Sequence, residues 1–237
     1  MKNPDLHLAH FIEHEAKKLR SIPDVISLMQ KLQEKLAEVD GLRWFNLLYL
    51  RVTEAINEEN WADFEWMEAL DVEFAKLYFQ GIGACLKKNP QAPLAWRVLM
   101  DRRFHKLKKV QYALAGINAH INRDLMLAVA KAYERTRRNP SREEYKEYTA
   151  VNTILERTEV RMVQQLATGW VKVFCSILKP LDRIFIMFLI RHWRETAWKN
   201  GVRSWTFKDK PHALRGLIRT RDKIAYKRGR ILLSAWW

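Results

Sequence analysis

Apolar residues recur along most of the chain at the three- and four-residue spacing of amphipathic helices, and no stretch shows the alternation typical of a strand. Gly and Pro, which interrupt helices, number only eight and seven among 237 residues. The pattern predicts helices over residues 5–20, 22–38, 42–57, 61–87, 94–102, 106–138, 141–176, 180–200 and 210–230. Gly201 is expected to end the helix before it. Because the linkers are short, we expect one all-α domain over residues 1–237, a multi-helix bundle around a long buried central helix.

The predicted helix over residues 106–138 is apolar on most sides, which is typical of a helix inside a protein. It nevertheless carries Asn118, His120, Asn122 and Asp124. At about 100° per residue, Asn118 and Asn122 share one face, and His120 and Asp124 share another. Unpartnered buried polar groups cost roughly 1–3 kcal/mol each, so the four residues indicate either a hydrogen-bond network or a functional site. The pairing of His120 with Asp124 is typical of both.

Other predicted helices carry polar residues on apolar faces. Asn46 shares a face with Tyr49 and Thr53, and Asp71 shares one with Phe74 and Tyr78. A carboxylate on an apolar stripe is costly unless it is paired, so the simpler interpretation of Asp71 is a tie between two helices. Two further candidates, Asn152 and Arg194, lie on the later helices. We expect Arg194 to hold an anion or to pair with Asp71 or Asp124.

The charge of the chain is uneven. The net charge of +15 divides into −4 for residues 1–95 and +19 for residues 96–237. A basic helix over about residues 208–231 precedes an apolar end that contains two Trp residues. Such a helix could bind nucleic acid or an anionic membrane surface, although a solvated basic face with a docked apolar end is the more common arrangement.

Recognisable catalytic motifs are missing from the sequence. It contains no nucleophile elbow, no phosphate-binding loop, no dinucleotide fingerprint, no CxxC and no HExxH pattern. A metal ion remains a secondary possibility, with His120, Asp124 and Asp71 as candidate ligands. Cys85 and Cys175 are expected to be buried thiols. The absence of a signal peptide or long apolar run predicts a cytoplasmic protein.

Several short stretches together carry a resemblance to a known family. They are residues 40–41, 44–46 and 49, residues 70–71, 74–75 and 78–79, residues 115–116, 118–122 and 124–125, residues 151–152, and residues 194 and 197–198. The chain resembles, over about residues 40–198, the mainly bacterial family called domain of unknown function 5995. The resemblance implies a single helical domain whose signature residues are polar and lie on facing helices. It implies no reaction and does not account for the basic C-terminal helix.

Two hypotheses about function follow. In the first, a buried pocket binds or transforms a small molecule, and His120 acts as general acid or base oriented by Asp124. The expected ligand-binding residues are Asn46, Asp71, Asn118, Asn122, Asn152 and Arg194, with Trp44 or Trp198 as an apolar wall. In the second, the protein is a non-enzymatic interaction module, in which the polar cluster sets helix register and the basic half binds a polyanion or an acidic membrane.

Overall fold

The protein is described by a computed structural model of residues 3–165 and 180–234, with side chains over 3–157 and 185–234. Within these ranges the chain forms helices and no strand, which confirms the predicted all-α class. The elements are α1 (Pro4–Ala16), α2 (Ile22–Lys35), α3 (Leu42–Asn57), α4 (Phe64–Leu86), α5 (Leu94–Met100), α6 (Lys109–Ala119), the π-helical turn η1 (His120–Asp124), α7 (Leu125–Thr136), α8 (Arg142–Gln165), α10 (Pro180–Thr206) and α11 (Pro211–Leu232). The predicted continuation of α8 over residues 166–176 lies outside the described residues.

Local sequence determines several helix starts. Asn3 caps α1 by accepting a hydrogen bond from the backbone N–H of Asp5. Ser21 and Asp24 form a reciprocal capping box at the start of α2. These side chains satisfy backbone N–H groups that have no partner within the helix, and a Pro in the first turn of α1 and α2 removes one such group outright.

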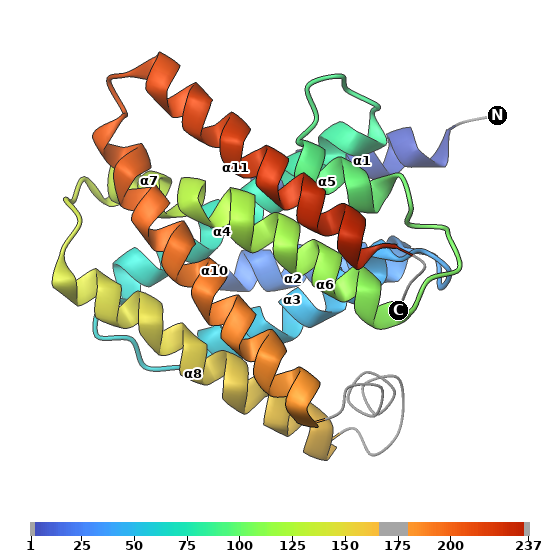
Figure 1. Ribbon diagram of the computed structural model, residues 1–237, viewed down its shortest axis with the longest axis horizontal. Helices are drawn as coiled ribbons and strands as arrows, with labels where there is room; N and C mark the ends of the chain where they lie inside the picture. Colours follow the sequence, from blue (N-terminus) through green and yellow to red (C-terminus); the bar gives the residue numbers. More distant parts are fainter. Residues whose placement is uncertain (1–2, 166–179, 235–237) are drawn as a thin grey trace.

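The run formed by α6, η1 and α7 is the centre of the bundle (Figure 1). Helix α3 packs against α6, α4 and α10 pack against α7, and α11 packs against α5 and α6. One hydrophobic cluster joins α1–α3, most of α4, α5 and α6, and a second joins the start of α4 to α7, α8 and α10. Since η1 connects α6 to α7, its polar residues lie where the two clusters meet.

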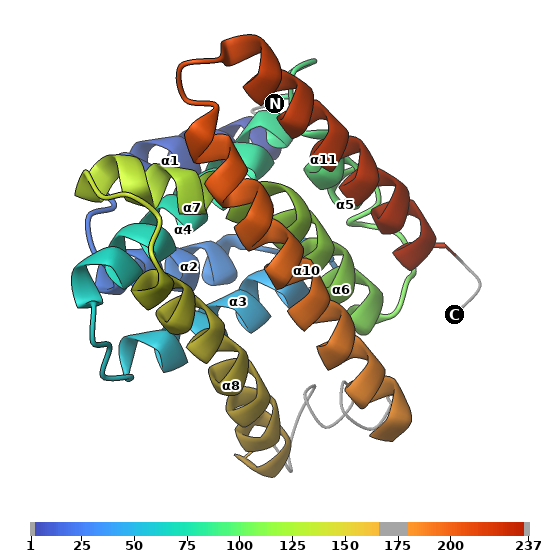
Figure 2. The same cartoon turned by 60° about the vertical axis from the view of Figure 1, so that its left-hand side comes forward.

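Helices α10 and α11 leave a shared turn and diverge across the central run, as Figures 1 and 2 show. The prediction that Gly201 ends α10 is wrong, because the helix continues to Thr206. A Cβ on Gly201 would lie 2.7 Å from Cβ of Val129 and 3.1 Å from the carbonyl oxygen of Met126. This glycine therefore allows α10 to lie close against α7.

The basic C-terminal helix docks on the bundle along a narrow face. Arg221, Ala225 and Gly229 of α11 are buried, and Leu233 beyond its end is buried as well. Ile231, in contrast, is 65% exposed. Within the described ranges, no helix is both long and apolar enough to cross a bilayer.

Candidate functional site

The most distinctive local feature of the site is the π-helical turn η1, which begins at His120 and ends at Asp124. The backbone N–H of Leu125 bonds to the carbonyl oxygen of His120, five residues earlier. The sequence predicts one uninterrupted α-helix here, and this expectation is wrong. Single π turns inside α-helices occur frequently at functional sites.

His120 and Asp124 form a buried pair. Nδ1 of His120 lies 3.1 Å from Oδ2 of Asp124, and both residues are almost inaccessible to solvent. The indole N–H of Trp96 donates to the same carboxylate oxygen at 2.7 Å, and Arg123 pairs with Oδ1. Asp124 is therefore held by three side chains, and it fixes the orientation of the imidazole.

The environment determines the charge of each partner. Burial is the largest influence on His120 and lowers its pKa below the usual value, despite the opposing effect of Asp124. Burial alone would raise the pKa of Asp124, but the charge of Arg123 and the hydrogen bond with His120 lower it overall. At neutral pH the pair thus consists of a neutral imidazole and an ionised carboxylate.

Aromatic rings enclose the imidazole of His120. The ring of Phe74 stacks on it with centroids 3.4 Å apart and planes inclined by 4°, and Tyr49 meets it edge-on at 4.6 Å. Phe45, Tyr78 and Trp96 complete the enclosure with centroids 5.6–5.9 Å from the imidazole. Among these six rings, Phe74 is the one that is partly exposed.

Three buried polar atoms near this enclosure have no hydrogen-bond partner among the described residues. They are Nε2 of His120, the hydroxyl of Tyr49 and Oδ2 of Asp71. Burial raises the pKa of Asp71 to about 7, with a further contribution from Glu68. Burial and the charge of Asp71 raise the pKa of Tyr49. The simpler interpretation of Asp71, a tie to a Tyr or Asn on another helix, is not what the described structure shows.

Asn118 and Asn122 face α11 instead of His120. The amide nitrogen of Asn122 donates to Oδ1 of Asn118 at 3.1 Å, and Asn118 donates to the carbonyl oxygen of Ala225 at 2.7 Å. Oδ1 of Asn122 accepts hydrogen bonds from Arg221 and Arg228. The two pairs predicted on separate faces therefore exist, but they belong to different environments.

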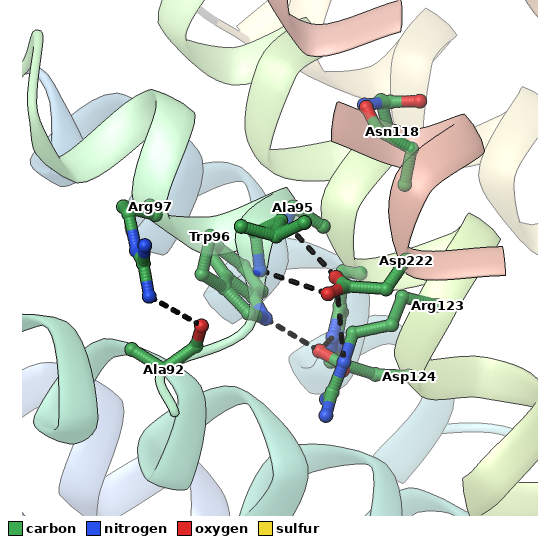
Figure 3. A network of polar contacts seen from close by, with 11 residues as sticks. Ala92, Ala95, Trp96, Arg97, Asn118, Arg123, Asp124 and Asp222 are labelled. Atoms are coloured by element: carbon green, nitrogen blue, oxygen red, sulfur yellow. Dashed lines mark hydrogen bonds and ion pairs between the residues drawn. The ribbon is translucent and has the colours of Figure 1, made fainter. Parts of the chain in front are cut away.

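A third set of contacts connects the site to α5 (Figure 3). Asp222 accepts hydrogen bonds from the backbone N–H groups of Leu94 at 2.9 Å and Ala95 at 3.0 Å, so it caps α5 from another helix. Nε of Arg123 lies 3.8 Å from Oδ1 of Asp222. Arg123 therefore bridges Asp222 and Asp124, while Asn118 lies apart from these contacts in the same view.

Asn46 is part of the core and offers no free donor. Its amide nitrogen donates to the carbonyl oxygen of Met29 and to Oε1 of Gln33, and its Oδ1 accepts from the hydroxyl of Tyr78. With both amide hydrogens used, Asn46 ties α2, α3 and α4 together.

Asn152 and Arg194 meet each other away from the His120 pair. Nε of Arg194 donates to Oδ1 of Asn152 at 2.8 Å, and Nη2 donates to the carbonyl oxygen of Tyr148 at 2.7 Å. The guanidinium also lies 4.3 Å from the centroid of the Tyr148 ring. The expected ion pair of Arg194 with Asp71 or Asp124 does not occur among the described contacts, because its guanidinium is bonded to acceptors on α8 instead.

The aromatic residues that surround His120 are not the predicted Trp44 and Trp198. Trp198 packs against Trp66, Tyr133, Tyr145 and Tyr148 in the second cluster, and Trp44 lies under Lys109.

The candidate metal ligands His120, Asp124 and Asp71 do not form a metal site, since no group of three potential ligands occurs in the described part of the chain.

Sequence reasoning missed four partners of the site: Trp96, Asp222, Arg221 and Arg228. One available signal was Asp222, one of only two acidic residues in the basic stretch 199–230. Such an isolated acid suggests a specific partner.

Comparison with known protein families gives a match over most of the chain. No curated protein and no solved structure matches the chain. The profile described as Family of unknown function (DUF5995) matches residues 22–235, which includes α11 and is wider than the stretch 40–198 that carries the resemblance. The chain therefore belongs to this family of unknown function.

Proposed function

We propose that this protein binds a small molecule between α3, α4 and η1, and that His120 exchanges a proton with it at Nε2. One observation carries the proposal. Nδ1 of His120 is held by Asp124, whereas the buried Nε2 has no partner among the described residues. A neutral imidazole that donates Nδ1–H to a carboxylate presents the lone pair of Nε2 as a base.

The carboxylate of Asp124 suits this role. It orients the imidazole, and its negative charge stabilises the imidazolium that forms once Nε2 has accepted a proton. Trp96 holds the same carboxylate oxygen as His120, and Arg123 holds the other oxygen. This leaves Nε2 as the reactive position of the pair.

Asp71 and Tyr49 supply further polar groups for the ligand. With a pKa of about 7, the carboxyl group of Asp71 can donate a hydrogen bond when protonated and accept one when ionised. The hydroxyl of Tyr49 is un-ionised and can donate or accept. Unpartnered buried groups cost free energy, so a ligand that supplies their hydrogen bonds gains binding free energy.

Phe74 controls access in this proposal. It covers one face of His120 and is itself partly exposed, so movement of this side chain would open a route from solvent to the imidazole. Rotation of a partly exposed side chain is fast compared with typical turnover.

We also propose that the protein acts in the cytoplasm. Cys85 is a free thiol whose pKa is raised to about 12, first by burial. Such a thiol is inert and fits a reducing compartment. The side chain of Cys175 lies outside the described residues.

A second candidate function, binding of a polyanion, is favoured by one observation. Arg219, Lys223 and Lys227 follow each other at four-residue intervals on α11, and all three are exposed. This spacing puts three cations on one face of the helix, where they attract phosphate-bearing polymers or anionic lipid.

A fragment screen tests the first candidate. The imidazole nitrogens of the protein are labelled with ¹⁵N, and small amides, carboxylic acids and carbonyl compounds are added while Nε2 of His120 is observed. We expect some compounds to shift this resonance and to lose binding in His120→Asn but not in His192→Asn, which changes an exposed histidine of α10. The proposal fails if no compound shifts Nε2, or if binders retain their affinity for folded His120→Asn.

A further inference from the structure

We propose that Arg221 and Arg228 of α11 bind a phosphomonoester group above Asn122. This site lies on the side of the central run that meets α11, whereas His120 faces α3 and α4. The inference does not depend on the function proposed for His120.

Two guanidinium groups converge on one neutral oxygen. Nη2 of Arg221 lies 3.2 Å from Oδ1 of Asn122, and Nη1 of Arg228 lies 2.7 Å from the same atom. Neither arginine forms an ion pair with a carboxylate within the described part of the chain. Each guanidinium has five N–H donors, so most of them remain available.

Arg221 is a buried cation whose hydrogen bonds are incomplete. Only 8% of the residue is exposed, and its buried Nε–H has no hydrogen-bond partner among the described residues. Burial and the nearby charge of Arg228 both lower the pKa of Arg221. Buried cations are normally paired, because an uncompensated charge away from water is costly.

The chemistry favours a phosphomonoester over a carboxylate. A single guanidinium matches a planar carboxylate with two parallel hydrogen bonds, so one arginine would suffice. Two guanidiniums suit a group with three terminal oxygens and a charge of about −1.5 to −2, which is that of a phosphomonoester at neutral pH. A phosphodiester, with one charge per phosphate, balances only half of the pair.

The surrounding side chains hold this arrangement in place, and one of its two arginines is partly exposed. Asn118 fixes α11 over the central run by its bond to the carbonyl oxygen of Ala225. Gly229 allows a close approach, since a Cβ there would lie 2.6 Å from a methyl carbon of Val98. Arg228 is partly exposed, and its guanidinium carbon lies 5.4 Å from the centroid of the Trp193 ring, so the site borders α10 as well as α11. Figure 2 shows how these two helices diverge.

Calorimetric titration with inorganic phosphate and with phenyl phosphate tests the site. A titration with sodium chloride of equal ionic strength is the reference for nonspecific effects of ionic strength. We expect saturable binding to the full chain, weakened about tenfold or more in Arg221→Gln and in Arg228→Gln, since a hydrogen bond between charged groups contributes roughly 1.5–3 kcal/mol. Arg228→Lys, which keeps the charge and loses the planar fork, should show an intermediate loss.

Two controls separate this site from the alternatives. Arg215→Gln removes an exposed cation of the same helix, and Arg203→Gln removes an exposed cation of α10; both should bind phosphate like the wild type. Circular dichroism establishes that each variant is folded. The proposal is overturned if phosphate binds no better than chloride, or if folded Arg221→Gln and Arg228→Gln both keep wild-type affinity.

Vesicles identify the source of the phosphomonoester. Phosphatidylcholine vesicles with and without phosphatidic acid are sedimented with the wild type and with both glutamine variants. Sedimentation that requires phosphatidic acid and both arginines indicates a lipid headgroup. Binding of phenyl phosphate without such sedimentation indicates a soluble metabolite. Sedimentation that survives both substitutions, without phosphate binding in solution, contradicts the site.

Discussion

The imidazole of His120 lies face to face with the ring of Phe74, their centroids 3.4 Å apart and their planes inclined by 4°. This contact contributes to the near-complete burial of His120, which is 2% exposed although its Nε2 lacks a partner among the described residues. Removal of Phe74 should therefore expose a histidine that is already neutral and correctly oriented.

Phe74→Ala should accelerate the reaction of His120 with diethyl pyrocarbonate, which attacks neutral imidazoles. In the wild type we expect slow modification of His120, measured by peptide mass spectrometry. The matched control is Phe188→Ala, which removes a ring that is 64% exposed on α10. Equal rates in wild type and folded Phe74→Ala would contradict the role of Phe74 as the cover of the site.

Asp124→Ala should destabilise the protein strongly. It leaves Trp96, Arg123 and His120 without their shared acceptor, and the loss of one partner from a buried ion pair typically costs about 3–5 kcal/mol. Urea unfolding measures the effect, and Asp209→Ala, at an exposed position, should change the free energy of unfolding by no more than about 0.5 kcal/mol. A small effect of Asp124→Ala would mean that the network contributes little to stability.

Asp71 should make the protein less stable as the pH rises. Its folded-state pKa of about 7 exceeds the ordinary value of 3.8, so its contribution is greatest below pH 3.8 and is lost as the pH rises through about 7. At about 1.4 kcal/mol per pKa unit, the total loss is of the order of 4 kcal/mol. Asp71→Asn should thus become progressively more stable relative to the wild type between about pH 4 and pH 8. Urea titrations at several pH values test this, and a difference independent of pH would show that Asp71 ionises normally.

Gly201→Ala should destabilise the contact between α10 and α7. The added methyl group would overlap Val129, and overpacking of this kind typically costs about 1–3 kcal/mol. Gly216→Ala is the control, since a Cβ at Gly216 meets nothing within 4 Å. Because alanine favours helix more than glycine does, this control should stabilise α11 by up to about 1 kcal/mol. Thermal unfolding distinguishes the two, and stabilisation of both variants would contradict the close packing at Gly201.

Reversal of the charges at Arg219, Lys223 and Lys227 separates the two candidate functions. The triple Glu variant should elute from heparin at lower salt than the wild type, because it loses three exposed cations. Fragment binding at His120 should stay unchanged. If the triple variant loses fragment binding while it remains folded, the ligand lies on the basic face, and the interaction module becomes the better account.

Much of the fold was predictable from sequence because it depends on local signals. The bounds predicted for α3 are those observed, Leu42–Asn57, since an apolar stripe follows the break at residues 40–41. The two pairs of the central run were likewise predictable, because residues four apart on a helix are neighbours.

The rest of the site depends on contacts between distant parts of the chain. Trp96 and Asp124 are separated by 28 residues, and Asn122 and Arg228 by 106. The spacing of apolar residues carries no information on such pairings. The sequence analysis also misses the π turn, because the spacing of apolar residues there does not differ from that of the α-helix on either side.

The ¹⁵N spectrum of the His120 imidazole tests the central claim most directly. At neutral pH we expect a neutral ring with the proton on Nδ1, directed at Asp124, and a bare Nε2. Because burial lowers its pKa, the ring should stay neutral as the pH falls below about 6.5, where an ordinary histidine takes up a proton. A proton on Nε2, or an imidazolium at neutral pH, would contradict the proposal that His120 presents a free base to a ligand.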